Sequence, residues 1–335
     1  MTDAPITLVP LLASWHLRTP RYNSEHVAAA VAASTPDVVL TSALPAGYRA
    51  SQEWLETEQI ALPLSVMPWA ELHAVEVVGI HEPVPDPTAQ QQLRDYLEMY
   101  DEGKGRLARV DFAFQDVADL LTPALDLASI TEHVIPAVQA WRETELAELG
   151  AGPGTAWFAE RMDAMAQRVE GHTGRITLVV PVEELPAWLG LFPDGRAVVA
   201  SEAPSSDATK QRSLLDVALT GSAEDLEGLY HQLAEMSLPE AEYHQANILF
   251  QTGHLTEAAY SLEQTSAGDF FKPYYLPGFL LSRLGQFYDL LGKREQAKKM
   301  YRGVRALPFA PAVALDVAIS GLDAPFTLPE PPAEE

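Results

Sequence analysis

Apolar positions in the first two hundred residues form short continuous runs that alternate with segments of helical periodicity. Runs of this kind at Ile6–Leu12, Val38–Thr41, Val75–Ile80 and Arg175–Val180 predict buried strands. An alanine-rich segment that follows Ser24, a predicted N-cap, indicates a helix over Glu25–Ala33 between the first two strands. Because strands and helices alternate, we expect residues 1–200 to form an α/β domain with a mostly parallel sheet flanked by helices.

The pattern is purely helical between residues 88 and 148, which predicts a helical insertion in this domain. A glycine-rich breaker at residues 150–154 precedes an amphipathic helix that ends at Gly171, and a short helix is expected over Glu183–Gly190. Three further features are expected: a helix over Gln52–Glu58, a turn at Pro83, Pro85 and Pro87, and a linker over residues 201–209.

Three similar units follow residue 210. They align on Gly221, Gly253 and Gly292. The residue five positions after each glycine is apolar: Leu226, Ala258 and Ala297. The residue nine positions after it is apolar or aromatic: Tyr230, Leu262 and Tyr301. The separations of 32 and 39 residues bracket the 34-residue period of tetratricopeptide repeats, which this pattern resembles most clearly in its third unit. We therefore expect all-α helical repeats over residues 210–322, a capping helix over Ala312–Ile319, and a disordered tail over residues 323–335.

The repeat resemblance implies a partner-binding groove. Tetratricopeptide units stack to form a concave surface that is lined by the first helix of each pair. The groove candidates on those helices are Tyr243, Asn247, Phe250, Arg283 and Phe287. The sequence thus predicts another protein or a peptide as the partner, and it leaves self-association through the repeats open.

Composition narrows the classes of partner and compartment. The formal net charge of −25 argues against nucleic acid and against an anionic membrane surface, since both would be repelled. The chain has no cysteine, no secretory signal at its start, and no apolar run of the roughly 20 residues that a membrane helix needs. We expect an acidic cytoplasmic protein.

Three short motifs in the first 195 residues resemble those of the TraB/Tiki superfamily, which is related to erythromycin-esterase-like and ChaN-like proteins. Ala13-Ser14-Trp15-His16 lies where that family has Gly-Thr-x-His, Ser42 lies near its Glu, and Pro181-Val182-Glu183-Glu184 lies where it has Gly-x-x-His. The segments Arg161–Ala166 and Arg175–Val180 extend the likeness. The resemblance implies an α/β domain. Some family members are proposed to be metal-dependent hydrolases, which implies a metal site. Of the ligands in that family's motifs, this chain keeps His16 alone.

Two functions follow as hypotheses. The first is an interaction or scaffold protein without a cofactor, in which a degenerate, non-catalytic α/β domain is joined to the repeats. The second is a metal-dependent hydrolase of peptidase or esterase type, with zinc or manganese bound by His16, His81 and Glu183 or Glu184.

The proposed metal ligands can also have purely structural roles. His16 can be a hydrogen-bonded residue at a strand end, and Glu183 and Glu184 can be the acidic first turn of a helix. Five further residues are ligand-binding candidates, the first two for an anion and the others at the carboxyl edge of the sheet: Arg18, Arg21, Ser42, His81 and Glu82.

Overall fold

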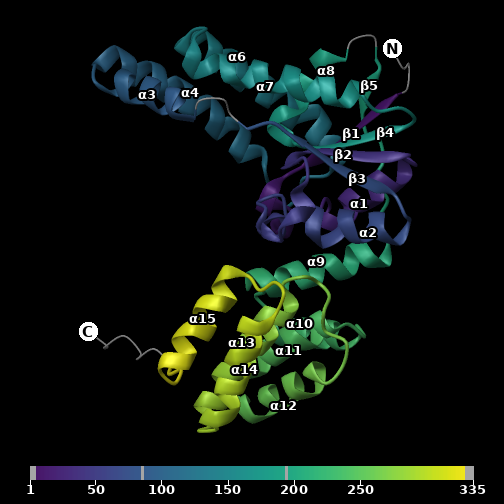
Figure 1. Ribbon diagram of the computed structural model, residues 1–335, viewed down its shortest axis with the longest axis vertical. Helices are drawn as coiled ribbons and strands as arrows, with labels where there is room; N and C mark the ends of the chain where they lie inside the picture. The colour runs from purple at the N-terminus through teal and green to yellow at the C-terminus, as the bar shows by residue number, and fades with distance from the viewer. Residues whose placement is uncertain (1–4, 84–86, 193–194, 329–335) are drawn as a thin grey trace. The chain divides into compact units, whose positions relative to one another are not determined.

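The computed structural model describes residues 5–83, 87–192 and 195–328 and contains two compact units, Met1–Ser213 and Leu214–Glu335 (Figure 1). The boundary lies inside helix α9 (Asp207–Thr220), so the segment predicted as a linker, residues 201–209, runs into the first turn of that helix.

The first unit contains a five-stranded sheet in the order β3-β2-β4-β1-β5, and every neighbouring pair is parallel. The strands are β1 (Ile6–Leu11), β2 (Val38–Pro45), β3 (Glu76–His81), β4 (Ile176–Pro181) and β5 (Ala197–Val199). This confirms the predicted α/β architecture and its first four strands. Strand β5 was not predicted, because three residues at a sheet edge, with Val198 about half exposed, leave no periodic signal.

Helices cover both faces of the sheet. In Figure 1, α1 (Ser24–Ala33) and α2 (Met67–Leu72) lie on one face, and α6 (Ile135–Leu149), α7 (Pro153–Glu170) and α8 (Leu185–Leu191) lie on the other. Asn23, rather than the predicted Ser24, caps α1: its side-chain oxygen accepts hydrogen bonds from the backbone N–H groups of Glu25 and His26. Asn23 also donates to the Thr209 carbonyl oxygen at 2.8 Å, which ties the start of α9 to this unit.

The predicted helical insertion consists of α3 (Pro87–Glu98), α4 (Asp101–Leu120), α5 (Leu127–Ser129) and α6. The helix expected over residues 52–58 is only a short 3-10 turn, Glu53–Glu56. Of the predicted proline turn, Pro85 lies outside the described residues. The remaining short helical segments are Ala13–Arg18, Tyr48–Ala50, Leu62–Val66, Ile130–Val134 and Val182–Glu184. None of the helices in the described ranges combines the length and apolar character needed to cross a membrane.

After α9, the described residues of the second unit form helices and their connections and contain no strand. Its helices are α10 (Leu226–Ala234), α11 (Pro239–Gln251), α12 (Leu255–Ser266), α13 (Leu276–Leu290), α14 (Arg294–Ala306) and α15 (Ala312–Asp323). Gly221, Gly253 and Gly292 all have a left-handed φ, between 64° and 89°, and each ends a helix before the chain turns back into the next one. Glycine meets this requirement without the steric cost that a Cβ would bring.

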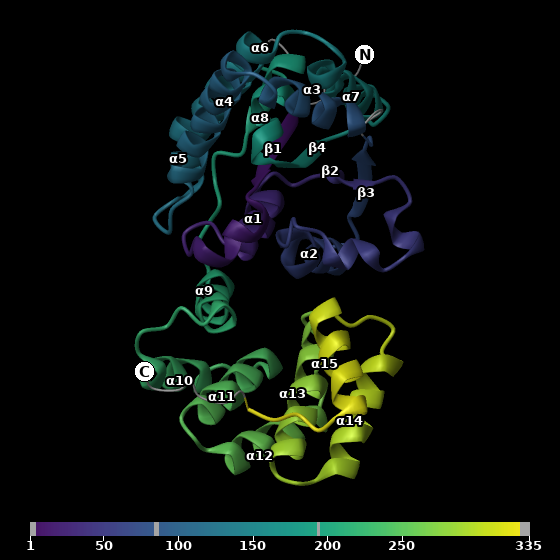
Figure 2. The same ribbon diagram turned by 90° about the vertical axis from the view of Figure 1, so that its left-hand side faces the viewer.

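Small and large residues fit together between these helices. Ala258 and Ala297 are fully buried, and the ring of Tyr301 on α14 fills the space between Gly285 of α13 and Gly321 of α15. A Cβ at either glycine would overlap that ring. Figure 2 shows α14 packed beside α13 and α15.

The first predicted unit packs differently, as its weaker sequence match suggests. Leu226 and Tyr230 are only half-buried, and Leu229 and Leu233 occupy the core instead. At the other end of the unit, the Phe326 N–H donates to Asp289 Oδ2 at 2.9 Å. Residues 329–335 of the predicted disordered tail lie outside the described part of the chain.

Candidate functional sites

One candidate site lies at the carboxyl edge of the sheet and is organised by the carboxylate of Glu184. This residue is 2% exposed and follows β4. One of its oxygens accepts hydrogen bonds from the Ser42 hydroxyl (2.5 Å) and the Trp188 indole N–H (3.2 Å). The other accepts from Arg161 at 2.8 Å. Three donors, one of them charged, therefore satisfy this buried anion.

His81 completes the network from the end of β3. Its Nδ1 lies 2.9 Å from the Ser42 carbonyl oxygen and 3.2 Å from Arg161 Nη2. A protonated Nδ1 donates to the carbonyl, whereas an unprotonated Nδ1 accepts from Arg161, so the tautomer decides which of the two bonds forms. His81, the last residue of β3, therefore lies beside Ser42 of β2, in the region of the carboxyl edge where the sequence placed His81.

A pocket of ≈ 330 Å³ opens beside this network. Ser42, His81, Arg161, Glu183 and Glu184 line it together with Ala43, Thr57, Glu58, Gln59, Arg142, Trp157, Phe158 and Pro181. The guanidinium of Arg142 is held between two aromatic rings, 4.0 Å from the Trp141 ring centroid and 4.2 Å from that of Phe158. This stacking fixes a cation at the pocket wall.

Glu183 differs from its neighbour Glu184. Its side chain is exposed at the pocket, and within the described residues its carboxylate accepts a hydrogen bond from its own backbone N–H. Desolvation by the surrounding protein raises its pKa above the ordinary value, and the nearby Glu184 charge adds to this, while that hydrogen bond, Arg142 and Arg161 lower it. Glu183 is therefore one of several titratable side chains at the pocket, with His81 and Glu58.

His16 does not reach this pocket. It is buried at the end of β1, where Nε2 accepts from the Leu12 N–H at 2.9 Å and Nδ1 lies 2.8 Å from the Tyr22 carbonyl oxygen. Burial lowers its pKa to about 4, so the ring is neutral at pH 7. Both ring nitrogens are committed to the backbone, which matches the structural role considered for this residue.

The other cationic candidates also lie away from the pocket. Arg18 is exposed, with its guanidinium 5.9 Å from the Trp15 ring centroid. Arg21 lines a different pocket, with His26 and Asp126. Glu82 forms an ion pair with Arg168.

The described residues contain no group of three or more His, Asp or Glu side chains placed to hold a metal ion. Structural and catalytic zinc sites in proteins use three or four protein ligands. Within the described part of the chain, His16 lies away from the pocket that holds His81 and Glu183, so these three predicted ligands do not come together.

The second candidate site is a groove of ≈ 390 Å³ in the helical unit. Alternate helices line it: α11 with Tyr243, His244, Asn247 and Gln251, α13 with Phe279, Ser282, Arg283 and Gln286, and α15 with Val313, Ala314 and Val317. Ala218, Leu219, Thr220 and Gly221, at the end of α9, complete the lining. Tyr243, Asn247 and Arg283 are thus found in the groove for which the sequence proposed them.

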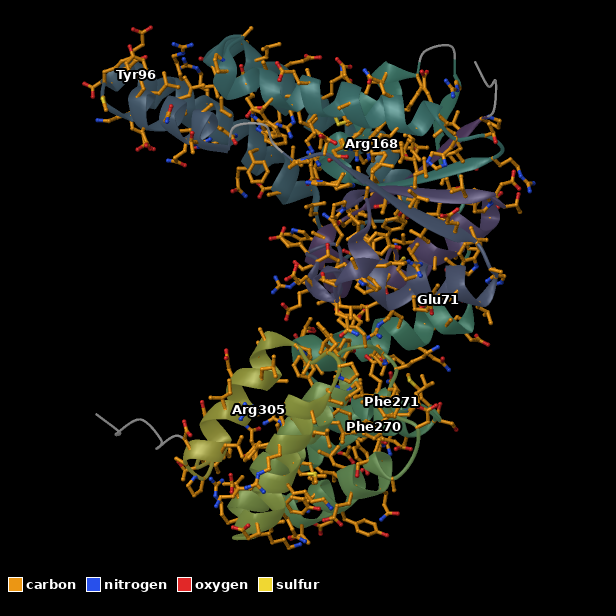
Figure 3. The ribbon with its side chains drawn as sticks, viewed as in Figure 1. Glu71, Tyr96, Arg168, Phe270, Phe271 and Arg305 are labelled. Carbon is orange, nitrogen blue, oxygen red and sulfur yellow. The ribbon has the colours of Figure 1, made fainter. Side chains whose placement is uncertain are left out.

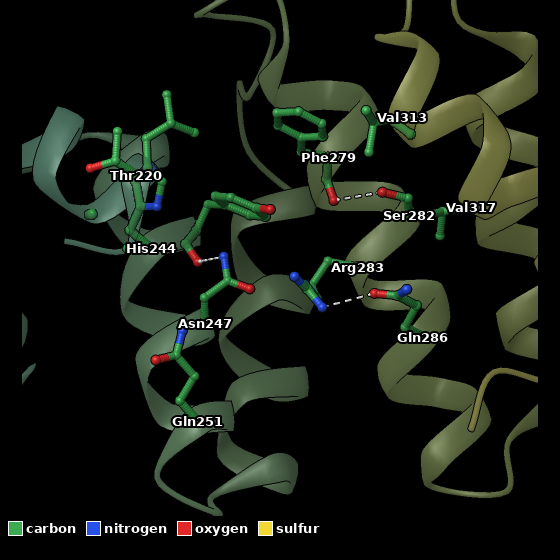
Figure 4. A pocket seen from close by; sticks show the side chains of 15 residues that line it. Thr220, His244, Asn247, Gln251, Phe279, Ser282, Arg283, Gln286, Val313 and Val317 are labelled. Carbon is green, nitrogen blue, oxygen red and sulfur yellow. Dashed lines mark hydrogen bonds between the residues drawn. The ribbon is translucent and has the colours of Figure 1, made fainter. Parts of the chain in front are cut away.

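Two buried polar atoms in this groove have no hydrogen-bond partner among the described residues. His244 is 3% exposed, and its Nε2 is unsatisfied, with Glu240 Oε1 at 3.9 Å. Asn247 donates to the Tyr243 carbonyl oxygen at 3.1 Å, but its own Oδ1 is buried and unsatisfied. Figure 4 shows Asn247 and Arg283 pointing toward one another across the groove. Arg283 donates to Gln286 Oε1 at 3.0 Å.

Phe250 and Phe287 do not line the groove. Their ring centroids lie 4.9 Å apart, and Phe287 is fully buried. The two rings pack α11 against α13, because each residue lies on the side of its helix that faces the neighbouring helix. Spacing along the sequence could not separate these two faces.

Several residues of both sites were not predicted. Arg161 follows Phe158 and precedes Met165 on the apolar stripe of α7, and a charged residue on such a stripe indicates a buried partner. In the groove, the prediction named Tyr243 and Asn247 of α11 but not His244 or Gln251. His244 and Gln251 lie three residues before and four residues after Asn247, and this spacing places the three side chains on one face of α11.

Comparison with known proteins identifies no relative of this chain. The chain matches no family model, no curated protein and no solved structure. The resemblances to TraB/Tiki domains and to tetratricopeptide repeats therefore rest on the sequence motifs.

Proposed function

We propose that this protein is an interaction protein whose helical unit is a tetratricopeptide-type module that binds an extended segment of another protein in its groove. The observation that carries the proposal is the pair of unsatisfied groups, His244 Nε2 and Asn247 Oδ1. A buried polar group without a partner costs about 1–3 kcal/mol, and folded proteins keep few of them. A ligand that bonds to both groups would recover this cost on binding.

The chemistry of the groove favours a peptide. Every residue of an extended peptide carries one backbone donor and one acceptor. Asn247 Oδ1 needs a donor, Arg283 supplies donors, and the amides of Gln251 and Gln286 supply both. Val313, Val317 and Phe279 offer apolar contacts for peptide side chains. In this proposal the α/β unit is a non-catalytic scaffold, since the Glu184 carboxylate is satisfied within the protein.

A library of linear peptides displayed on phage tests the proposal. We expect the full chain to enrich a sequence that binds, and we expect Asn247→Ala and Arg283→Ala to weaken the best peptide by about tenfold or more, as for central interface residues. Glu257→Ala, an exposed change on α12, is the matched control and should leave binding unchanged. Failure to enrich any sequence, or equal binding by the groove variants, would remove the proposal.

A second function, hydrolysis in the α/β unit, is favoured by one observation: Glu183 has a raised pKa and no side-chain partner in the described residues, and it shares its pocket with His81. A carboxyl group of this kind can act as a general base on a water molecule. Hydrolysis of p-nitrophenyl acetate and of peptide substrates should be measured for the wild type and Glu183→Gln, with elemental analysis for zinc and manganese. Activity that is equal in the two chains would dismiss this function.

A further inference from the structure

Helix α14 carries a strongly basic surface on an otherwise acidic protein. Residues 293–305 contain six Lys or Arg side chains and one Glu, a local charge of +5, whereas the whole chain has a formal net charge of −25. The apolar face of the helix is buried through Ala297, Tyr301 and Val304. The basic residues therefore lie on the faces of α14 that remain.

Half of these cations have a partner within the helical unit. Arg294 forms an ion pair with the buried Asp289 at 3.0 Å and also donates to the Leu322 carbonyl oxygen. Lys298 lies 3.4 Å from Glu295, and Lys293 lies over the Tyr288 ring at 5.6 Å from its centroid. These contacts account for the cations at the beginning of the helix.

Lys299, Arg302 and Arg305 are different. All three are exposed, and none has an ion pair or side-chain hydrogen bond within the described residues. Figure 3 labels Arg305 on the helical unit. Their spacing of three residues places them along one side of α14, over a rise of about 9 Å. Here we call these three residues the basic stripe.

We propose that the basic stripe is a second interaction surface, separate from the groove, and that it binds a short run of Asp or Glu residues on a partner protein. An extended chain advances about 3.3 Å per residue, so three or four acidic residues match the length of the stripe. Arginine recognises carboxylates with two parallel hydrogen bonds, which favours side-chain carboxylates as ligands.

The charge of the rest of the protein selects a short ligand over a long polyanion. Exposed charges interact over about 8–10 Å at physiological salt, so a short acidic segment experiences mainly the stripe. A nucleic acid or an anionic membrane would extend over surface whose net charge is strongly negative, and it would be repelled there.

Fluorescence anisotropy with a labelled hexaglutamate peptide tests the proposal on the full chain. We expect the triple variant Lys299→Glu, Arg302→Glu and Arg305→Glu to weaken binding by about tenfold or more, as the sum of three exposed charge pairs allows. A triple variant at exposed cations elsewhere, Lys104→Glu, Lys210→Glu and Lys272→Glu, changes the net charge equally and should bind like the wild type. Hexaglutamine is the uncharged control peptide.

Several results would overturn the proposal: no binding of hexaglutamate, equal binding by the stripe variant, or stronger stripe-dependent binding of duplex DNA or phosphatidylserine vesicles. Stripe-dependent self-association in sedimentation velocity, without hexaglutamate binding, would assign the surface to a second copy instead. Asn247→Ala should leave hexaglutamate binding unchanged, so this proposal and the groove proposal fail separately. A triple alanine variant of the stripe confirms the loss without introducing repulsion.

Discussion

The pocket of the α/β unit and the groove of the helical unit are similar in size, ≈ 330 and ≈ 390 Å³, and both are lined by polar side chains. They differ in how those side chains are used. In the pocket, three donors satisfy the buried Glu184 carboxylate, and Arg142 Nε is the buried lining atom without a hydrogen-bond partner among the described residues. In the groove, His244 Nε2 and Asn247 Oδ1 both lack such a partner within the described part of the chain. Polar groups satisfied by their own fold stabilise that fold, whereas unsatisfied buried groups cost free energy that a hydrogen-bonding ligand would recover.

The largest expected effect is on the satisfied network. Glu184→Ala leaves Arg161 as a mostly buried cation without its carboxylate, so we expect the free energy of unfolding of the α/β unit to fall by about 3–5 kcal/mol. All six tryptophans lie between Trp15 and Trp188, so tryptophan fluorescence in a urea titration reports on this unit alone. Glu183→Ala, next in sequence but without a side-chain partner, is the control. Equal destabilisation by both changes would contradict the comparison.

The second prediction concerns pH and the buried His16. Its folded-state pKa of about 4 lies below the ordinary value of 6.5, so the unfolded chain binds the proton more tightly. The contribution of His16 to the free energy of unfolding is fully present above pH 6.5. It is lost as the pH falls toward 4, and the total loss is about 3 kcal/mol. His26 adds a change in the same direction, because burial lowers its pKa too.

Urea titrations of the wild type and His16→Gln between pH 4.5 and 7.5, followed by tryptophan fluorescence, isolate the contribution of His16. The wild type should lose more stability than the variant as the pH falls. Identical pH dependence in the two chains would show that His16 titrates normally.

The third prediction concerns packing in the core of the helical unit. Gly285→Ala places a methyl group against the buried Tyr301 ring, and we expect a loss of about 1–3 kcal/mol, as for other overpacked cores. Circular dichroism during thermal unfolding measures it. Gly105→Ala is the control, because its Cβ meets only the end of the Arg109 side chain, at 3.6 Å. It should stabilise α4 by up to about 1 kcal/mol through helix propensity. Unchanged thermal stability of the Gly285→Ala variant would mean that the Tyr301 ring can move to make room for the added methyl group.

The smallest expected effect is the most informative about the groove. His244→Phe removes an unsatisfied buried nitrogen, so we expect the helical unit to become more stable by about 1 kcal/mol while peptide binding decreases. Thermal unfolding and titration with the enriched peptide measure the two quantities. His254→Phe, at an exposed position, should change neither. A His244 variant that loses stability would show that this residue supports the fold rather than a ligand.

The sequence by itself determined the elements whose signal is local. Continuous apolar runs gave the four long strands, and Gly221, Gly253 and Gly292 marked the helix ends because only glycine adopts a left-handed φ without steric cost. The three-residue β5 and the 3-10 turn at Glu53–Glu56 were not predictable, because elements this short show no periodicity. The cap at Asn23 rather than Ser24 depends on backbone geometry that a sequence of several polar residues leaves open.

Tertiary structure decided which candidates work together. The sequence predicted that His81 and Glu183 or Glu184 could meet at the carboxyl edge of the sheet. The shared contact of His81 and Glu184 with Arg161 from α7 depends on how that helix covers the sheet. His16 also follows a strand, yet it turns into the core, where the backbone engages both ring nitrogens. In the helical unit, Asn247 lies in the groove and Phe250 packs between helices, although only three residues separate them. A helix turns about 100° per residue, so the face that each residue shows is fixed only when neighbouring helices take their places.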